Sequence, residues 1–134
     1  MRLSSKTITA IKLFIDLGEH YQEGFISLKD VSRRKDVSKK FLEQIVPIYK
    51  ANGLLLGNRG NQGGYKLAKD PLDISLKDIV FTLETSFNKE EIGYLSIDDV
   101  VNRLDTIVDD FFSNISLHQL IEKQKESYSY DYSI

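Results

Sequence analysis

The stretch SLKDVSRRKDVSKKFLEQIVPIYKANGLLLGNRGNQGGYKL, residues 27–67, decides the fold. It contains two runs of helical periodicity, and each run starts at a serine that can cap a helix N-terminus. These runs predict helices over residues 27–35 and 38–51, joined by a tight turn at residues 36–37. Pro47 lies inside the second run, where it removes one backbone donor, so we expect a bend or a weak point there.

The second part of this stretch has the pattern of a β-hairpin. Short apolar runs at residues 54–56 and 65–67 flank GNRGNQGG, residues 57–64, which is rich in turn-forming residues. Two helices with a tight turn, followed by a hairpin, form a winged helix-turn-helix. In that fold the second of these two helices enters the major groove of DNA.

Working outward, the rest of the chain is predicted to be helical. We expect one helix from Ser4 or Ser5 to about residue 20 and another over residues 75–85, with a connection at residues 86–96. The first helix is expected to bury the apolar side chains Ile8, Ile11, Phe14, Ile15 and Leu17.

The clearest periodicity in the chain lies at residues 97–115, followed by a short helix from Ser116. Apolar side chains recur there at spacings of 4, 3, 4, 3 and 4, with Val100, Ile107 and Phe112 broadening the stripe. This spacing is typical of a helix that pairs with a second helix, so we predict a homodimer. The predicted dimerisation residues are Ile97, Val101, Leu104, Val108, Phe111 and Ile115.

The net charge of −2 conceals an asymmetry between the two halves of the chain. Residues 1–70 carry 13 Lys and Arg against 7 Asp and Glu, a net charge of +6, whereas residues 71–134 carry 5 against 13, a net charge of −8. A basic half joined to an acidic half indicates a polyanion-binding part attached to a part with another role. Chance clustering on solvated faces is the alternative.

Composition excludes several classes of protein. The 134 residues contain no cysteine, which rules out disulfides, thiolate metal sites, a cysteine nucleophile and an all-cysteine iron–sulfur cluster. We find no membrane span, signal peptide or catalytic constellation, and His20 and His118 lack a second metal ligand at useful spacing. A cytoplasmic protein without cofactor or metal, and not an enzyme, is expected.

Polar side chains on the predicted recognition helix fit DNA chemistry. Lys39 and Lys40 stand at its start, where free backbone amides and cations suit a phosphate or a guanine edge. Gln44 lies opposite the apolar face and can make two hydrogen bonds to adenine. Glu43 can accept from cytosine or pair with one of the lysines. A solvated helix face is the alternative for the whole group.

Other candidate contacts lie in the hairpin and at helix starts. Arg59, in the Gly-rich loop, can enter a narrow minor groove, and Lys66 and Lys69 can contact phosphates. Lys6, Thr7 and Ser27 lie near helix starts and are candidates for backbone contacts. The basic run Arg33, Arg34 and Lys35 either contacts DNA or is a solvated face.

The residues also resemble the Rrf-two family of bacterial winged-helix regulators. The family pattern covers nearly the whole chain and is carried by SKKFLEQ at 38–44, RGNQGGY at 59–65 and ISLKD at 74–78. The segment IDDVVNRLDTIVDDFFSNISLHQLIEK, residues 97–123, matches the family's dimer helix and the short helix after it. The resemblance implies Ser38, Lys40, Glu43 and Gln44 as the base-reading set, and it favours Arg59 in the minor groove.

The chain differs from the best-known members of the family in the residues that bind their iron–sulfur cluster. Cluster-binding members carry three cysteines before the dimer helix, and this chain has none. We therefore expect a regulator without a cluster, controlled by another protein or small-molecule effector or by none. Phe81, Phe87, Tyr94 and Phe112 could surround such a ligand, but ordinary core packing is the stronger interpretation.

Together these observations predict a mainly α protein with a small β-hairpin. Residues 1–85 form the winged helix-turn-helix DNA-binding domain, residues 86–126 the dimerisation helices and residues 127–134 a flexible tail. The expected function is a homodimeric transcriptional repressor on a pseudo-palindromic operator in double-stranded DNA. The alternative is a winged-helix module that binds a protein partner, which unlike DNA binding would not weaken steeply with salt.

Overall fold

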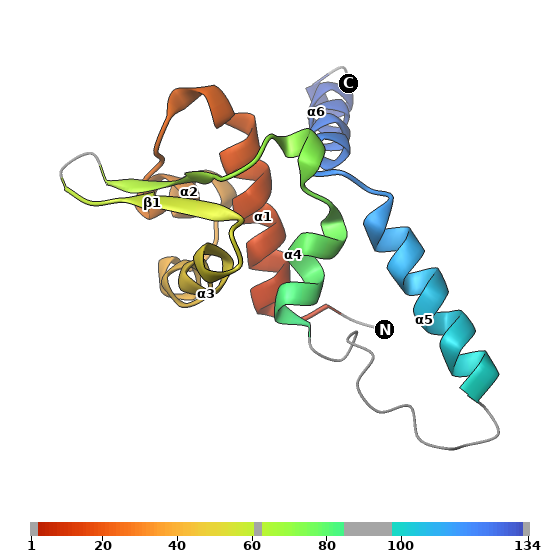
Figure 1. Ribbon diagram of the computed structural model, residues 1–134. Helices are drawn as coiled ribbons and strands as arrows, with labels where there is room; N and C mark the ends of the chain where they lie inside the picture. Colours follow the sequence, from red (N-terminus) through yellow and green to blue (C-terminus); the bar gives the residue numbers. More distant parts are fainter. Residues whose placement is uncertain (1–2, 61–62, 85–97, 133–134) are drawn as a thin grey trace.

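The computed structural model describes residues 3–60, 63–84 and 98–132, with the side chains of residues 98–99 and 128–132 left out. The predicted mainly α fold with one hairpin is confirmed (Figure 1). Ile97, Phe87 and Tyr94, which the sequence places at the dimer seam or beside a ligand, lie outside the described residues. The elements are α1 (Ser5–Glu19), a 3-10 turn (Tyr21–Glu23), α2 (Leu28–Lys35), α3 (Lys39–Ala51), β1 (Leu55–Asn58), β2 (Gly64–Leu67), a 3-10 turn (Pro71–Asp73), α4 (Leu76–Leu83), α5 (Asp98–Ser113) and α6 (Leu117–Tyr132).

The helix-turn-helix forms where the serines predict it. The Ser27 hydroxyl accepts from the Asp30 amide at 3.1 Å and caps α2. Asp36 ends α2 in the left-handed region at φ 52°, a conformation that an aspartate tolerates better than most residues. The Ser32 hydroxyl donates to the Val37 carbonyl at 2.6 Å and closes the turn. Local capping and turn hydrogen bonds thus fix where α2 ends and how the turn to α3 is closed.

Pro47 does not end α3. The helix is assigned continuously from Lys39 to Ala51, so it extends four residues beyond the proline. The proline costs one backbone hydrogen bond to the carbonyl four residues earlier. Buried apolar side chains on both sides of it, Val46 and Tyr49, hold the helix against the core.

The wing is a two-stranded antiparallel hairpin in which Leu55 pairs with Leu67 and Asn58 with Gly64. Ile26 extends this ladder, because it exchanges two backbone hydrogen bonds of 2.8 Å with Tyr65. A Cβ at Gly64 would lie 2.3 Å from the Ile26 carbonyl oxygen, so only glycine fits there. The contact joins the wing to the link between α1 and α2.

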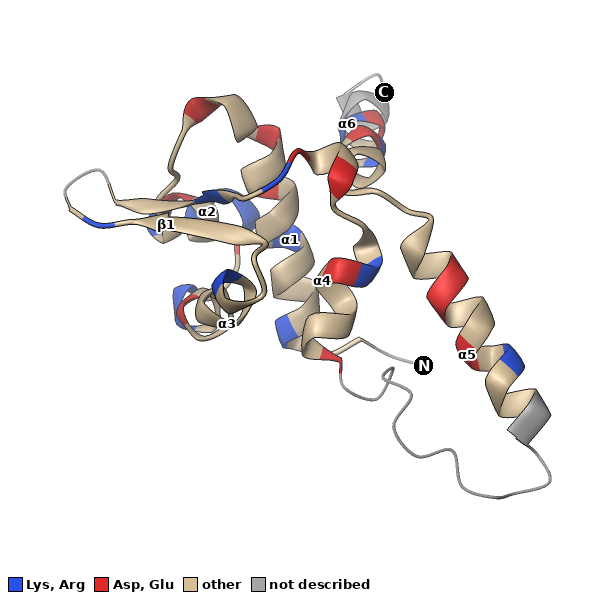
Figure 2. Cartoon of the chain, viewed as in Figure 1, with Lys and Arg blue, Asp and Glu red and all other residues tan. Residues whose placement is uncertain are grey.

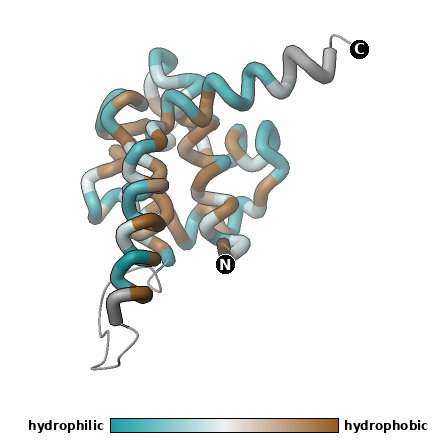
Figure 3. The backbone as a smooth tube through the Cα atoms, turned by 90° about the vertical axis from the view of Figure 1, so that its right-hand side faces the viewer, coloured by the Kyte–Doolittle hydropathy of each residue, from teal (hydrophilic) through white to brown (hydrophobic). Residues whose placement is uncertain are grey.

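The core is built around α1, which contacts α2, α3, α4, α6 and β2 (Figure 1). In Figure 3, brown hydrophobic stretches alternate with teal hydrophilic ones along the packed helices. Phe14 of α1 packs edge-on against Tyr49 of α3, with ring centroids 4.8 Å apart. Four of the five apolar residues predicted on the inner face of α1 contribute to the core, but Ile8 is 41% exposed. Its neighbours Thr7, Thr9 and Ala10 are buried, so Ile8 is exposed because it lies on the outer side of α1, away from the covering elements.

A second hydrophobic cluster joins α4 to α5. Leu76, Val80 and Phe112 are its buried members, and Val108 and Ile115 pack against them. The Leu76 amide donates to the Ile115 carbonyl at 2.7 Å, and the Leu117 amide donates to the Ile74 carbonyl at 2.8 Å. These bonds hold the α5–α6 junction beside the start of α4.

Helix α6 is longer than expected and packs on α1. Leu117 and Ile121 belong to the first cluster, and a Cβ at Gly18 would lie 2.5 Å from Ile121 Cδ1. The first turns of α6 therefore contribute to the same core as α1, α2 and α3, and the expected division of the chain at residue 86 stays a prediction. The backbone is helical to Tyr132, over most of the segment predicted to be a flexible tail.

No helix among the described residues is both long enough and apolar enough to cross a lipid bilayer.

Candidate nucleic-acid interface

Helix α3 has one buried face and one polar face. Leu42, Ile45, Val46 and Tyr49 are at most 1% exposed. The Tyr49 hydroxyl donates to the Ile79 carbonyl of α4 at 2.6 Å, and burial raises the pKa of this phenol. This buried hydrogen bond and the apolar contacts hold α3 rigidly to α1 and α4. The opposite face is therefore presented in a single orientation.

The predicted base-reading residues lie together on that polar face. Lys39, Lys40, Glu43 and Gln44 are all exposed. Lys39 Nζ lies 3.9 Å from a Glu43 carboxylate oxygen, and Lys40 and Gln44 have no ion-pair or side-chain hydrogen-bond partner among the described residues. Exposed donors and acceptors without protein partners are free to bind base edges and phosphates. The Ser38 hydroxyl accepts from the Phe41 amide at 3.2 Å, and its hydrogen remains available.

The wing extends from the same part of the molecule as α3 (Figure 1). Arg59 is exposed. The next residue, Gly60, has a φ of 106°, which glycine adopts without strain and other residues do not. Lys66 is half-buried and lies 4.7 Å from the Phe25 ring centroid. In Figure 2 the blue segments gather on α2, α3 and the wing, whereas α5 carries mostly red.

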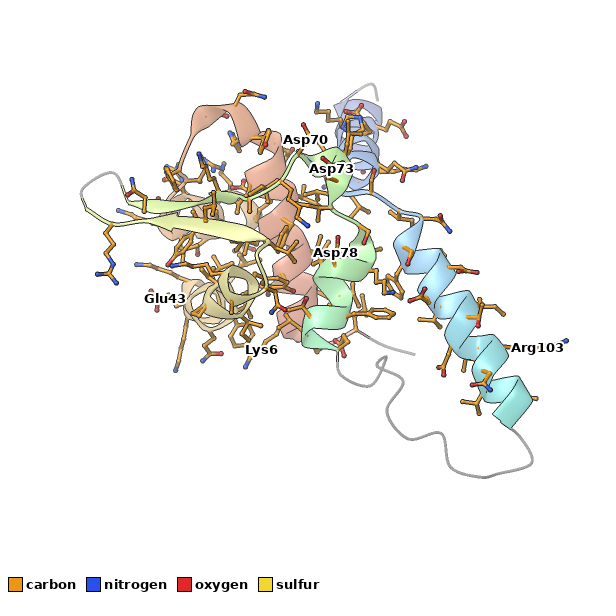
Figure 4. All side chains as sticks on the ribbon, in the orientation of Figure 1. Lys6, Glu43, Asp70, Asp73, Asp78 and Arg103 are labelled. Carbon is orange, nitrogen blue, oxygen red and sulfur yellow. The ribbon has the colours of Figure 1, made fainter. Side chains whose placement is uncertain are left out.

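The two candidates at the start of α1 differ sharply. Lys6 is exposed, as Figure 4 shows near the start of the helix. Thr7 is fully buried, and its hydroxyl donates to a Glu84 carboxylate oxygen at 2.6 Å. The prediction that Thr7 contacts the DNA backbone conflicts with this burial, because its hydroxyl is already used inside the protein.

Glu84 is a structural residue that the sequence pattern does not reveal. One of its oxygens accepts from Thr7 and also from the Ser4 amide at 2.8 Å, and these hydrogen bonds lower the pKa of the carboxyl group. Glu84 thereby connects the end of α4 to the cap of α1. The partners are 77 and 80 residues away along the chain, so no local motif could indicate the pairing.

The basic run on α2 is mostly structural. The Arg34 guanidinium makes two hydrogen bonds of 2.9 Å to the carboxylate of Asp16, whose side chain is 1% exposed. These hydrogen bonds raise the pKa of Arg34 further. Lys35 donates to Glu19 at 2.6 Å. Arg33 has the most exposed side chain of the three cations, at 74% against 30% for Arg34, and it contacts Asp30 at 3.3 Å.

Three cations from α2 and α3 line a depression on the surface. These three residues are not grouped in the sequence-based prediction. Lys29 and Arg33 lie one turn apart on α2, and Lys39 stands at the start of α3. Ser27 is half-buried at the cap of α2, two residues before Lys29. The sequence signal that could have grouped Lys29 with Arg33 is their i, i+4 spacing, which puts two residues on the same face of a helix.

The predicted dimerisation set is divided between two faces of α5. Val108 and Ile115 pack into the chain's own second cluster, and Val101 is half-buried. A separate row is exposed by 53–69%: Val100, Leu104, Ile107 and Phe111. We call these four residues the outer row. In Figure 1, α5 lies on the far side of α1 and α4 from the wing.

The chain lacks the thiolates of a cysteine-ligated iron–sulfur cluster, and the described residues do not form a multi-ligand metal site. The chain has no cysteine. Within the described ranges, no group of three or more His, Asp or Glu side chains is placed to hold an ion. His20 contacts Glu23 through Nδ1 and lies 4.0 Å from Asp16. The two ring nitrogens of His20 therefore face carboxylates of the protein.

Comparison with known proteins identifies one family. Residues 3–123 match the model of the Rrf2 family, described as an iron-dependent transcriptional regulator. The transcriptional regulator IscR of Photorhabdus laumondii is 32% identical over an alignment of 134 positions that covers 93% of this chain and 82% of the relative. IscR of Serratia proteamaculans is 31% identical, with 92% of this chain and 81% of the relative covered.

Solved structures of similar proteins have the same fold. T. potens IscR has a TM-score of 0.80 and 29% identity, with 95% of this chain and 90% of that chain covered. CymR of B. subtilis, titled the global cysteine regulator, has a TM-score of 0.80 and 26% identity over 92% of this chain and 98% of that chain. The oxidised form of CymR from Staphylococcus aureus has a TM-score of 0.74 and 31% identity, covering 91% of this chain and 97% of that chain. These named relatives are transcriptional regulators rather than enzymes.

Proposed function

The chain belongs to the Rrf2 family of transcriptional regulators. From this membership we propose that it is a cytoplasmic repressor, which binds a pseudo-palindromic operator as a homodimer. In this proposal α3 enters the major groove and the wing contacts the minor groove. The observation that carries it is the polar face of α3, where Lys40 and Gln44 are exposed without protein partners in the described part of the chain.

Each contact is assigned by its chemistry. Gln44 reads an adenine through two hydrogen bonds, and Glu43 accepts from a cytosine amino group. Lys39 and Lys40 bind a guanine edge or neighbouring phosphates at the helix start. Arg59 enters an A·T-rich minor groove, whose narrow width concentrates negative potential.

Phosphate contacts position the protein on either side of these bases. The depression lined by Lys29, Arg33 and Lys39 offers three cations against one carboxylate, Asp30, and Lys6 adds a further cation at the start of α1. Ser27 and Lys66 are further backbone contacts in this scheme. Neutralising several phosphates releases counterions, so affinity falls steeply as salt rises.

The homodimer is proposed from the outer row of α5. Four large apolar side chains exposed along one face of a helix are unusual on an isolated monomer, and a second copy of α5 would cover them. Two recognition helices then reach successive major grooves about 34–36 Å apart. Val108 and Ile115 support this helix from the inner side.

The proposed sensing chemistry excludes a cysteine-ligated iron–sulfur cluster, because the chain supplies no thiolate. Any control of DNA binding must use a different effector, either a small molecule or a protein. This separates the chain from the iron-dependent description of its family.

The experiment is selection of bound genomic fragments by the purified full chain, followed by fluorescence anisotropy on the recovered operator. We expect Gln44→Ala to weaken specific binding by about 1–3 kcal/mol and to relax base choice at one position in each half-site. Lys40→Ala should weaken all sequences more evenly and lower the slope of log affinity against log salt by about 1.

The matched controls change residues outside the proposed DNA contacts. Gln22→Ala removes an exposed glutamine beside α1, and Lys125→Ala removes a cation on α6 that contacts Glu122. Both should leave DNA affinity unchanged. Equal losses in Gln22→Ala and Gln44→Ala would refute the assignment of α3. Binding of a protein partner with no salt dependence would favour the interaction-module alternative.

A further inference from the structure

The outward face of α3 changes from polar to apolar after Gln44. Its first half carries the polar side chains that the proposed function assigns to base edges and phosphates. Its second half carries Pro47, Ile48 and Ala51, which are all exposed and have no polar side-chain atom. We call these three residues the apolar end of α3. Pro47 and Ile48 are poorer helix formers than the polar residues that a solvated helix face usually carries, so their place on this face does not serve the helix itself.

Ile48 is the largest side chain of the apolar end. It is 40% exposed and belongs to neither of the two hydrophobic clusters formed by the described residues. Its backbone carbonyl accepts from the backbone amide of Asn52 at 3.1 Å and from the side-chain amide of Asn52 at 2.8 Å, so the helix is intact around it. A β-branched side chain in a helix has one strongly preferred rotamer. Ile48 therefore loses little conformational freedom when another molecule contacts it.

The place of Ile48 in a complex with DNA follows from that of Gln44. Residues four apart lie one above the other on a helix, so Lys40, Gln44 and Ile48 form one row along α3. Four residues of helix rise by about 6 Å. Successive base pairs are about 3.4 Å apart along the DNA axis. When Gln44 contacts an adenine in the major groove, Ile48 thus faces base edges one or two base pairs farther along.

The major groove offers one kind of group that suits an apolar side chain. Adenine, guanine and cytosine present hydrogen-bond donors and acceptors there, whereas thymine adds a C5-methyl group. Placing Ile48 against a donor or an acceptor would remove water from that group without replacing its hydrogen bond, which is unfavourable. Placing Ile48 against a methyl group removes two apolar surfaces from water, which is favourable.

We propose that Ile48 contacts the C5-methyl group of a thymine within two base pairs of the adenine that Gln44 reads. Pro47, which is adjacent and rigid, covers one side of this contact. The inference rests on the proposed function and adds a thymine to the bases that it assigns. It also gives the exposed apolar end of α3 a role in the choice of operator.

Deoxyuridine substitution tests the contact, because it removes only the methyl group and keeps base pairing. The operator recovered by genomic selection is prepared with each thymine of one half-site replaced in turn, and affinity is measured by fluorescence anisotropy. Burial of one methyl group corresponds to about fourfold in affinity. We expect one thymine in the half-site at which deoxyuridine weakens binding of the wild-type chain by about fourfold. Ile48→Ala should bind the thymine and deoxyuridine operators equally.

The control variants separate this contact from general effects of losing an apolar side chain. Leu72 is 64% exposed in the 3-10 turn Pro71–Asp73, outside α3 and the wing, so Leu72→Ala should keep the full response to deoxyuridine. Ile48→Val retains the branched Cβ and should keep part of the response. Urea unfolding of Ile48→Ala should match that of wild type closely, because the side chain packs in neither cluster.

The possible failures distinguish this contact from the proposed function. A wild-type chain that binds no genomic fragment would refute both together. Operator binding that depends on Gln44 but is unaffected by deoxyuridine at every thymine would refute only the methyl contact. An equal deoxyuridine response in wild type and Ile48→Ala would also overturn it. Loss of the response in Pro47→Ala but not in Ile48→Ala would overturn the assignment to Ile48.

Discussion

The Gly64→Ala substitution tests whether the wing is held to the body by a backbone contact that excludes any side chain. A Cβ at position 64 would lie 2.3 Å from the oxygen and 2.5 Å from the carbon of the Ile26 carbonyl, and 2.9 Å from the Ser27 nitrogen. All three are backbone atoms beside the cap of α2, so no rotamer change relieves the overlap. The Ile26 segment must move away from β2.

The cost follows from the contacts that this movement breaks. Ile26 and Tyr65 exchange two backbone hydrogen bonds of 2.8 Å, each with a net value of about 1 kcal/mol. If the bonds were kept instead, the overpacking would cost about 1–3 kcal/mol. Either response lowers the free energy of unfolding by about 2 kcal/mol.

Urea unfolding at fixed protein concentration measures this loss, because the stability of a dimer depends on concentration. For a slope of about 2 kcal/mol per molar urea, the midpoint should fall by about 1 M. Gly57→Ala is the matched control on the paired strand, where the nearest atoms are the Lys50 side chain at 3.1 Å and the Tyr65 ring at 3.2 Å. Equal stability of the two variants would refute the reasoning, since the change in unfolded-chain entropy is common to both.

Two further predictions concern charges inside the DNA-binding part. Arg34→Ala removes both hydrogen bonds to the buried Asp16 carboxylate and leaves only His20, 4.0 Å away, beside it, so it should cost about 3 kcal/mol of unfolding free energy. The adjacent and exposed Arg33→Ala should cost less than about 0.5 kcal/mol. Similar losses measured by urea unfolding would contradict the structural role of the Arg34–Asp16 pair. The pKa of Glu84 lies below its ordinary value of 4.5, mainly because of the Thr7 hydrogen bond, so its contribution to stability is complete above that value and is lost as the pH falls through the folded-state pKa. Glu84→Gln should therefore be less stable than wild type at pH 7, and this difference should shrink as the pH falls below 4.5. A difference that is independent of pH would show that the carboxylate charge has no such role.

The elements that local chemistry dictates could be predicted from the sequence. Ser27 and Ser38 each accept a backbone hydrogen bond at the expected helix start, and the glycine-rich hairpin forms in the expected place. The polar face of α3 was also predictable, because helical periodicity separates Gln44 from the apolar residues. These features depend on neighbours within a few positions of the chain.

Thr7 and Arg34 show where such prediction fails. Each has the sequence context of a DNA contact, a hydroxyl near a helix start and a cation in a basic run. Their partners are Glu84 and Asp16, 77 and 18 residues away, and these contacts exist only after the helices have packed. Whether a polar side chain is free to contact DNA depends on the residues that the fold brings beside it. Helical periodicity carries no information about those distant residues.

By itself, the amino-acid sequence determined the order of the elements, the two faces of α3 and the absence of any thiolate for a cluster. The tertiary structure decided which apolar row of α5 is internal and which is exposed. Both rows satisfy the same helical period, so the sequence pattern cannot distinguish them. The choice is made when Val108 and Phe112 pack against α4, because this docking leaves Leu104 and Phe111 facing outward.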